Sequence, residues 1–522
     1  MAHQEGTTLE RQGQLFFTAI DTKLAKVLAE AHDLASDCPE ILSRIEADLD
    51  AAARRKKALR LLDARYAGEQ TLPLPLEALV EAAAKQIEAE ELSLQVGRPR
   101  THPMVVCFFL VLRGYFGSVS DHHSWERFAD SLTLRAYLEP YASRLPGRTT
   151  LLELLNQVSA STRSFILDKQ LAQVIGEDLD DLMQQTIDST AVAANSAWPT
   201  EIGLIQGLLE RAHRVGRVLD EYEVEPFRMW HTERWFTQLQ SAMMAILLGK
   251  PRRARQQRKA YRAYIAKADQ LLTFLHNEHD AREAAVAQAM LPPSRRLQLQ
   301  RLWRLLGDAL ADADTLLNYL SAKSLSDTEV VRDEAEKIFS LSDGSAAFII
   351  KGERDTVFGY KVQVGRSTNG FITAVSVPEG NAADSAQLVP MVEQHLARTG
   401  ITPALVTADD GYASREAERK LKTDHGISDV SITGAKGRRQ LGESLWNSEL
   451  YAQSRADRSA VESLMFTLKH SFAFGRCRRR GIDAVRAEIM EKAIAYNFWR
   501  LAYIREQQAA ETEQKRRRRP AA

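Results

Sequence analysis

Cysteine is scarce in this chain of 522 residues, which has three, at positions 38, 107 and 477. They lie far apart and show no CxxC or Cys/His spacing. We therefore expect reduced, mostly buried thiols, and neither a disulfide framework nor a zinc site. A charge excess is missing as well, because Lys and Arg total 69 and Asp and Glu also total 69. Any argument for a polyanionic partner must therefore come from local charge.

Long apolar runs are also absent. The longest, residues 104–112, is too short to span a bilayer, and the first residues lack the basic and apolar segments of a signal peptide. We therefore expect a cytoplasmic protein with no membrane partner. Hydrophobic residues make up 44% of the chain and charged residues 26%, which excludes a collagen-like or wholly disordered protein. The length predicts three or four domains' worth of fold.

Most of the chain shows helical patterns. Apolar residues at three- and four-residue steps predict a helical arm or bundle over residues 1–95. Residues 96–178 predict short helices of the size found in helix-turn-helix-like DNA-binding regions, although many small helical modules share that size. A long helical segment follows at about 201–340, and residues 476–522 predict a C-terminal helix and a basic tail.

Residues 346–434 differ from the rest because they read as strands with intervening helices. Residues 360–364 alternate like a half-buried strand, Asn369-Gly370 signals a tight turn, and residues 371–377 predict the returning strand. A helix is expected at 384–399, a strand buried on both faces at 404–409, a helix at 414–422 and a last strand at 430–433. This order predicts an α/β sheet of mixed direction.

Three segments carry the local positive charge. Arg98 and Arg100 lie in Gly-Arg-Pro-Arg, which is similar to hooks that enter the DNA minor groove, or is a plain linker. Arg252, Arg253 and Arg255 begin a stretch without acidic residues that either follows a phosphate backbone or forms a solvated helix face. The third segment contributes four arginines to predicted DNA binding: Arg476, Arg478, Arg479 and Arg480.

Three acids stand out by their positions. Asp188 lies in a short strand-like run at the start of the α/β region, and Asp409 ends the buried strand. A carboxylate just past a buried strand is where α/β sheets place ligand and metal groups, although for either residue alone a turn or N-cap role is the favoured interpretation. Glu462 lies on a predicted helix, on one strip with Arg458 and Lys469 beside the apolar face. A surface Arg–Glu pair is the alternative there.

Carboxylates from two strands and a helix suit hard divalent cations, which prefer oxygen ligands. Two such ions can activate a nucleophile and stabilise the leaving oxygen in a phosphoryl displacement. Asp188, Asp409 and Glu462 meet that need and are therefore predicted to hold metal ions. Neither Ser189 nor Tyr412 has an evident activating base, which argues against a serine or tyrosine recombinase.

These pieces together resemble a known family. Its motifs are matched by residues 188–195, Gly370-Phe371-Ile372, 408–412, 458–462 with Lys469, 475–481 and 496–498. Over about residues 97–505 the chain resembles bacterial insertion-sequence transposases of the DDE class, closest to ISNCY-type members. The resemblance implies a multidomain α + α/β fold. Helical N-terminal regions would precede a ribonuclease-H-like mixed β-sheet catalytic domain at 179–475, interrupted by the helical insertion at about 201–340.

Residue by residue, Asp188 and Asp409 resemble the family's two catalytic aspartates, and Glu462 its glutamate. The pattern Asp-x-Gly-aromatic selects Asp409 over its neighbour Asp410. Arg458 and Lys469 match the Arg and Lys of the related Tyr-x2-Arg-x3-Glu-x6-Lys signature. Arg455 replaces its tyrosine, a departure under which we expect only an electrostatic contribution to DNA binding.

The resemblance implies a transposase that uses Mg²⁺, with Mn²⁺ as a substitute, to cut the element's ends and join the freed 3′-OH to target DNA. Its partners would be double-stranded DNA, both terminal inverted repeats and target, and further copies of the chain in a dimer or larger assembly. On DNA it would be nucleoid-associated. Two alternatives stay open: a ribonuclease-H-like nuclease without strand transfer, and a catalytically silent DNA-binding protein derived from a transposase.

Overall fold

The computed structural model describes residues 8–66, 69, 72–73, 75–90, 94, 100–117, 121–195, 201–225, 232–247, 254–325, 343–350 and 356–518. The chain forms two compact units. One, here the sheet-bearing unit, comprises residues 1–49, 97–195 and 347–522, and the other, the helical unit, comprises 50–96 and 196–346. The boundary between the units falls within one helix, at residues 49 and 50. Residues 1–95, which the sequence predicts as a single region, are therefore divided between the two units.

One mixed sheet forms the centre of the sheet-bearing unit. Within the described residues it has six strands, in the order β2-β3-β1-β5-β6 with β4 also on β3. Their bounds are β1 Gln184–Ala193, β2 Ala347–Ile349, β3 Val357–Arg366, β4 Ile372–Ser376, β5 Leu405–Ala408 and β6 Asp429–Ile432. β1 runs antiparallel to β3 and parallel to β5, and β5 runs parallel to β6. The predicted sheet of mixed direction is therefore present.

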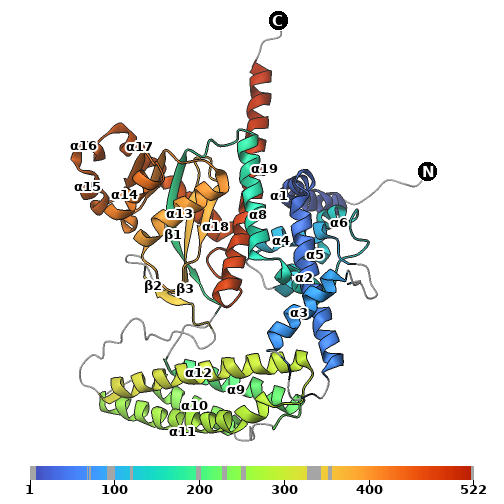
Figure 1. Cartoon of the computed structure of the whole chain (residues 1–522). Helices are drawn as coiled ribbons and strands as arrows, with labels where there is room; N and C mark the ends of the chain where they lie inside the picture. Colours follow the sequence, from blue (N-terminus) through green and yellow to red (C-terminus); the bar gives the residue numbers. More distant parts are fainter. Residues whose placement is uncertain are drawn as a thin grey trace. The chain divides into compact units, whose positions relative to one another are not determined.

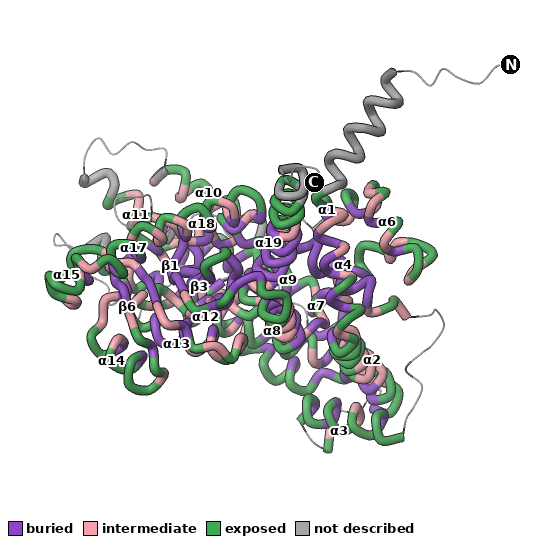
Figure 2. The backbone as a smooth tube through the Cα atoms, turned by 90° about the horizontal axis from the view of Figure 1, so that it is seen from above, coloured by how far each residue is buried: buried purple, intermediate pink, exposed green. Residues whose placement is uncertain are grey.

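Burial explains why these strands read as they do. β1 and β3 are buried along most of their length, and the last three residues of both β5 and β6 are buried (Figure 2). Helix α13 (Asp384–Thr399) contacts β1, β3 and β4, and its apolar side chains share a core with the central strands (Figure 1). The core includes Ile187, Leu388, Val406 and Tyr412. The helix predicted at 384–399 is confirmed.

The turn between β3 and β4 ties the sheet to a long helix near the C-terminus. Gly370 adopts a φ of +86°, which glycine tolerates, and its N–H donates to the Ser367 carbonyl at 3.1 Å. The Asn497 side chain, on α19 (Ile482–Arg518), donates to the Ile372 carbonyl at 3.0 Å and accepts from its N–H at 2.9 Å. This pairing satisfies backbone groups at the start of β4 and docks α19 on the sheet.

Helices make up the rest of the sheet-bearing unit. Besides α13 and α19 they are α1 (Thr8–Asp37), the start of α2 (Glu40–Arg65), α4 (Pro103–Tyr115), α5 (Asp121–Asp130), α6 (Leu132–Leu138), α7 (Arg148–Gln157), α8 (Ala160–Gly176), α14 (Arg415–Asp424), α15 (Ala435–Leu441), α16 (Glu443–Trp446), α17 (Glu449–Asp457) and α18 (Ser459–Ser471). The apolar run 104–112 is buried in α4, which packs against α1 and α19. Among the described residues no helix is both long and apolar enough to cross a membrane.

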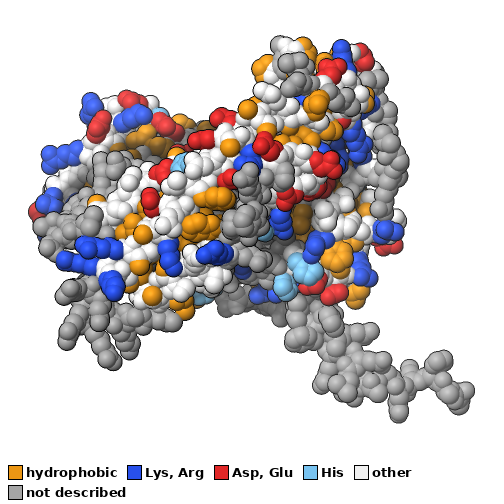
Figure 3. Space-filling view, turned by 90° about the horizontal axis from the view of Figure 1, so that it is seen from below, with side chains coloured by type: hydrophobic (Ala, Val, Ile, Leu, Met, Phe, Trp, Pro, Cys, Tyr) orange, Lys and Arg blue, Asp and Glu red, His pale blue; other side chains and the backbone are white. Residues whose placement is uncertain are grey.

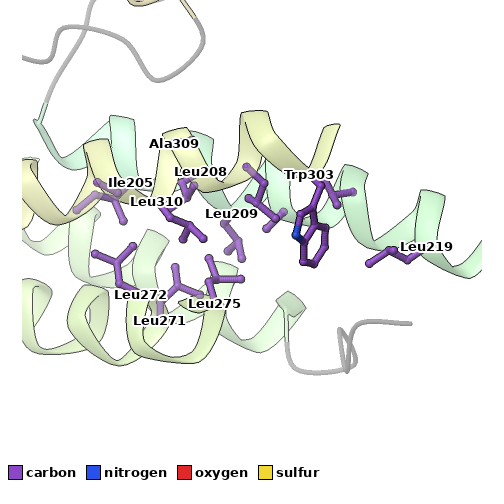
Figure 4. Close-up of a cluster of buried hydrophobic side chains, with 14 of the residues drawn as sticks. Ile205, Leu208, Leu209, Leu219, Leu271, Leu272, Leu275, Trp303, Ala309 and Leu310 are labelled. Carbon is purple, nitrogen blue, oxygen red and sulfur yellow. The ribbon is translucent and has the colours of Figure 1, made fainter. Parts of the chain in front are cut away.

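The helical unit interrupts the sheet between β1 and β2. Its insertion consists of α9 (Glu201–Glu221), α10 (Thr232–Leu247), α11 (Ala254–Ala287) and α12 (Pro293–Leu325), and α3 (Leu76–Ala89) belongs to the same unit. Leu209, Leu275, Trp303 and Leu310 belong to a shared apolar core contributed by the insertion helices (Figure 4). The helices expected at about 201–340 are therefore found where the structure describes this segment.

Candidate active site

A pocket of about 700 Å³ lies beside β1, in the sheet-bearing unit. The lining residues that carry charge are Asp188, Asp384, Asp409, Arg458, Glu462 and Lys469. The three predicted acids and the two predicted cations that flank Glu462 therefore all face one space.

Strand register brings Asp188 and Asp409 side by side. Ile187 on β1 pairs with Ala408 on parallel β5, so the next residue of each strand occupies the neighbouring position. Adjacent strands are about 4.8 Å apart, and successive side chains point to opposite faces. Ile187 packs in the core with α13, so Asp188 points away from it. The carboxylates of Asp188, within β1, and Asp409, just past the end of β5, thus lie side by side.

Local backbone donors fix the orientation of both aspartates. Asp188 Oδ1 accepts the Ser189 N–H at 2.7 Å, and Asp409 Oδ1 accepts the Gly411 N–H at 2.9 Å. The Asp188 side chain is 13% exposed and that of Asp409 30% exposed. In both residues Oδ2, the other oxygen, is the one nearer the Arg458 guanidinium.

Glu462 reaches the pocket from α18. The predicted apolar stripe is confirmed, since Val461, Leu464, Met465, Leu468 and Phe472 are buried. Because α18 packs on β1 through this stripe, Glu462 is left 69% exposed at its border.

A single guanidinium stands among the three acids. Arg458, where α17 meets α18, has Nη2 at 4.0 Å from Asp188 Oδ2 and 3.9 Å from Asp409 Oδ2. Its Nη1 lies 4.0 Å from Glu462 Oε1. This geometry places one guanidinium about 4 Å from each of three carboxylates, on β1, just past β5 and on α18.

The carboxylates suit a hard divalent cation in their chemistry but are not closed around one. Among the described side chains, no group of three or more His, Cys, Asp or Glu is arranged to hold a metal ion. The donors are nevertheless all carboxylate oxygens, and two of them are oriented by backbone N–H groups, which fits Mg²⁺ or Mn²⁺. The predicted acids therefore face one pocket and are suitable metal ligands, and Arg458 lies between them.

Asp410, the competitor for the second aspartate, points elsewhere. Its Oδ1 accepts the N–H groups of Lys436 at 2.6 Å and Gly437 at 3.1 Å, at the start of α15. Gly434 has a φ of +102°, and a Cβ there would come within 2.7 Å of the Asp410 side chain. Asp410 thus holds the loop after β6 and is not among the pocket's lining residues.

Asp384 is a fourth pocket carboxylate that the sequence reasoning missed. It begins α13, where an acidic residue is an ordinary helix start, so the local signal does not distinguish it. Its Oδ1 lies 2.9 Å from Lys361 Nζ and accepts the Gln363 side-chain amide at 2.9 Å. Gln363 in turn accepts a hydrogen bond from the buried Tyr412 hydroxyl. Burial raises the pKa of Tyr412, and the charges of Asp384, Asp188 and Asp409 raise it further.

The predicted DNA-contacting cations are scattered over several environments. Lys469 lines the pocket, whereas Arg455 stacks on Trp446, with its guanidinium carbon 4.1 Å from the ring centre. Arg476, Arg478 and Arg480 are exposed, and Arg480 donates to the Asn195 carbonyl at 2.8 Å. On the face shown in Figure 3, basic and acidic side chains are interspersed.

Arg479 is placed differently from the prediction. Its guanidinium pairs with Glu491, which is 1% exposed, and is itself only 18% exposed. It is therefore engaged by an interior carboxylate, which does not favour the predicted DNA contact. Arg100 is half-buried. Arg98, Arg252 and Arg253 lie outside the described residues, as does the side chain of Arg255.

Comparison with known families decides what kind of domain holds this pocket. Residues 333–498 match the family model described as Transposase DDE domain. This part of the chain is a DDE-type transposase domain. The match includes Asp409, Glu462 and the cations beside them, while β1 with Asp188 precedes it. No curated protein and no solved structure matches the chain.

The match supports the expected DDE-type insertion-sequence transposase, a family whose substrate is DNA and which generally uses divalent metal ions.

Proposed function

We propose that the chain cuts the ends of an insertion sequence and joins the freed 3′-OH to target DNA, with Asp188, Asp409 and Glu462 as the catalytic acids. One observation carries the proposal: Asp188 within β1 and Asp409 just past β5 share a guanidinium with Glu462 of α18. The mixed sheet around them, a hairpin followed by parallel strands and helices, supports the expected ribonuclease-H-like fold.

Each residue has a defined task in this proposal. Asp188, Asp409 and Glu462 would hold Mg²⁺ or Mn²⁺, which when bound supplies Lewis acidity and offsets charge at the phosphate. The N–H groups of Ser189 and Gly411 keep the two aspartates oriented toward the pocket. Phosphoryl transfer depends mainly on alignment and charge neutralisation, so well-oriented ligands contribute directly to rate.

The cations of the pocket would bind the substrate. Arg458 and Lys469 line it beside the acids and can neutralise phosphate oxygens of a DNA strand. Tyr412 is fully buried and burial raises its pKa, so its hydroxyl stays protonated and out of reach of a phosphate. Ser189 is 3% exposed. Both facts favour direct attack by water and then by the 3′-OH over a covalent protein–DNA intermediate.

The proposed partners are the terminal inverted repeats of the element and a target duplex. We propose that residues 96–178, which contain α4 to α8, recognise the repeats, and that paired-end cleavage requires at least a dimer.

The test uses the full-length protein and DNA bearing the inverted repeats that flank its coding region. Asp188→Asn, Asp409→Asn and Glu462→Gln should each lower Mg²⁺-dependent cleavage by about 10³-fold or more, with DNA binding retained. Asp410→Asn is the matched control, because an amide oxygen can still accept the two N–H groups at α15. Full cleavage by any of the first three variants would remove that acid from the site.

A second assay separates the alternatives. Pre-cleaved ends are incubated with the protein, Mg²⁺ and a target plasmid. Joined product supports the transposase, whereas cutting of intact ends without joining would indicate a nuclease. Wild-type protein that binds the ends and does neither would indicate a silent DNA-binding protein.

A further inference from the structure

The Arg458 guanidinium is held by charge rather than by direct hydrogen bonds. Its three carboxylate contacts are 3.9 to 4.0 Å long, while charge-assisted N–H···O bonds measure about 2.7 to 2.9 Å. Within the described part of the chain, its buried Nε has no hydrogen-bond partner. The side chain therefore lies among three acids without being locked to any one of them.

A structural arginine of the same unit shows the contrast. Arg113 donates to Glu491 through Nη2 at 2.6 Å and through Nε at 2.9 Å, a two-point pair. Such a pair fixes both side chains and resists exchange. Arg458 has none of these features, and its side chain is 23% exposed at the pocket wall.

The position of Arg458 also coincides with the place where a cation is needed. Carboxylates on β1, just past β5 and on α18 repel one another when brought together, and a positive charge about 4 Å from each offsets that repulsion. A divalent ion ligated by the same oxygens would supply the same compensation and would be repelled by the guanidinium. The divalent ion and the guanidinium therefore cannot both stay close to the three carboxylates.

We propose that Arg458 is the exchangeable counter-ion of the acidic pocket: its guanidinium occupies the centre until a divalent cation displaces it toward the pocket mouth. This inference rests on the proposed function of the three acids as metal ligands. Displacement frees the guanidinium for a phosphate, so the residue that partly offsets the charge of the acids before metal binding becomes a substrate contact. Premature metal loading in the absence of DNA is thereby disfavoured.

The experiment measures Mn²⁺ binding to the full-length protein without DNA, from the free-Mn²⁺ paramagnetic resonance signal. Arg458→Gln removes the charge and should tighten Mn²⁺ binding at least tenfold, about 1.4 kcal/mol. Arg458→Lys keeps the charge, so its Mn²⁺ affinity should stay within about threefold of that of wild type. Arg455→Gln is the matched control, because Arg455 stacks on Trp446 outside the pocket lining and should leave the affinity unchanged.

The melting temperature gives a second readout. Without metal, Arg458→Gln should melt below wild type, because three carboxylates lose their counter-ion, and Mn²⁺ should raise its melting temperature more than that of wild type. If this variant fails to fold, a wild-type crystal soaked in Mn²⁺ decides. Mn²⁺ on the acids with the guanidinium moved away from Asp409 supports the proposal.

The outcomes separate the two claims. Mn²⁺ binding by wild type with equal or weaker binding by Arg458→Gln would overturn the counter-ion role and leave the metal site standing. The same holds for a crystal with Mn²⁺ bound and Arg458 unmoved. Absence of Mn²⁺ binding in wild type and in all variants would instead contradict the proposed function itself.

Discussion

Glu491 offers a sharp test of the interior of the sheet-bearing unit. Its carboxylate, 1% exposed on α19, accepts from Arg113 at 2.6 and 2.9 Å, from Arg163 Nε at 2.8 Å and from Arg479. Burial alone opposes its ionisation, but the three guanidinium groups outweigh burial and lower the pKa of Glu491. Glu491→Gln would leave two buried arginines, Arg113 and Arg163, and the partly buried Arg479 without their counter-ion.

Removing one partner from a buried ion pair typically costs about 3–5 kcal/mol, a large share of the roughly 5–15 kcal/mol that holds a domain folded. Hydrogen exchange by mass spectrometry on α19 and α4 isolates this unit. The slowest amides of these helices should exchange about a hundred to several thousand times faster in Glu491→Gln. The control is Asp483→Asn on the same helix, whose side chain is 93% exposed and whose ion pair should contribute little.

The stabilisation by Glu491 should depend on pH. Because the pKa of folded Glu491 lies below its ordinary value of 4.5, its stabilisation is fully present above that pH and is lost as the pH falls below it. The difference between wild type and Glu491→Gln should therefore be constant from pH 7 to 5 and shrink below 4.5. Exchange rates that agree within threefold at pH 7 would refute the view that this cluster stabilises the unit.

Three more predictions follow from single residues. Burial lowers the pKa of His395 from 6.5 to about 4, so near pH 5 the unfolded chain binds a proton that the folded chain does not. The free energy of unfolding, measured with urea, should therefore fall by about 2 kcal/mol from pH 7 to 5. His395→Gln should abolish this fall. A Cβ on Gly359 would lie 2.0 Å from a β1 carbonyl, so Gly359→Ala should destabilise the fold by about 1–3 kcal/mol and lower its melting temperature. Gly344→Ala, where a Cβ would meet nothing within 4 Å, should leave the melting temperature unchanged. Iodoacetamide followed by mass spectrometry should label half-buried Cys38 before Cys107, because burial raises the pKa of the latter to about 12; equal labelling would contradict its burial.

Local patterns predicted the parts of the fold that are decided locally. The expected strand at 404–409 is β5, 405–408, and the helix expected at 414–422 is α14, 415–424, because burial on both faces and an N-capping Ser414 leave signatures within a few residues. The apolar stripe of α18 was predicted for the same reason. Its border then determined that Glu462 faces the pocket together with Arg458.

Features decided by distant pairing were not predictable in this way. Arg479 looks like its exposed neighbours in sequence, and only the folded chain brings Glu491 to it. Asp384 resembles any acidic helix start until Lys361 and Gln363 are placed beside it. The choice of Asp409 over Asp410 came from a family pattern, while the backbone donors that hold Asp410 lie 26 and 27 residues further along the chain.

The insertion of the helical unit has a consequence for synthesis. β1 ends at Ala193, and its antiparallel neighbour β3 begins only at Val357, so a ribosome must deliver about 160 further residues before the two can pair. Until then one of the pocket's aspartates sits on a lone strand with unpaired edges, which is prone to aggregation. A nascent chain stalled before residue 357 should therefore depend on chaperones, and slow final sheet closure should be the step that limits the yield of active protein.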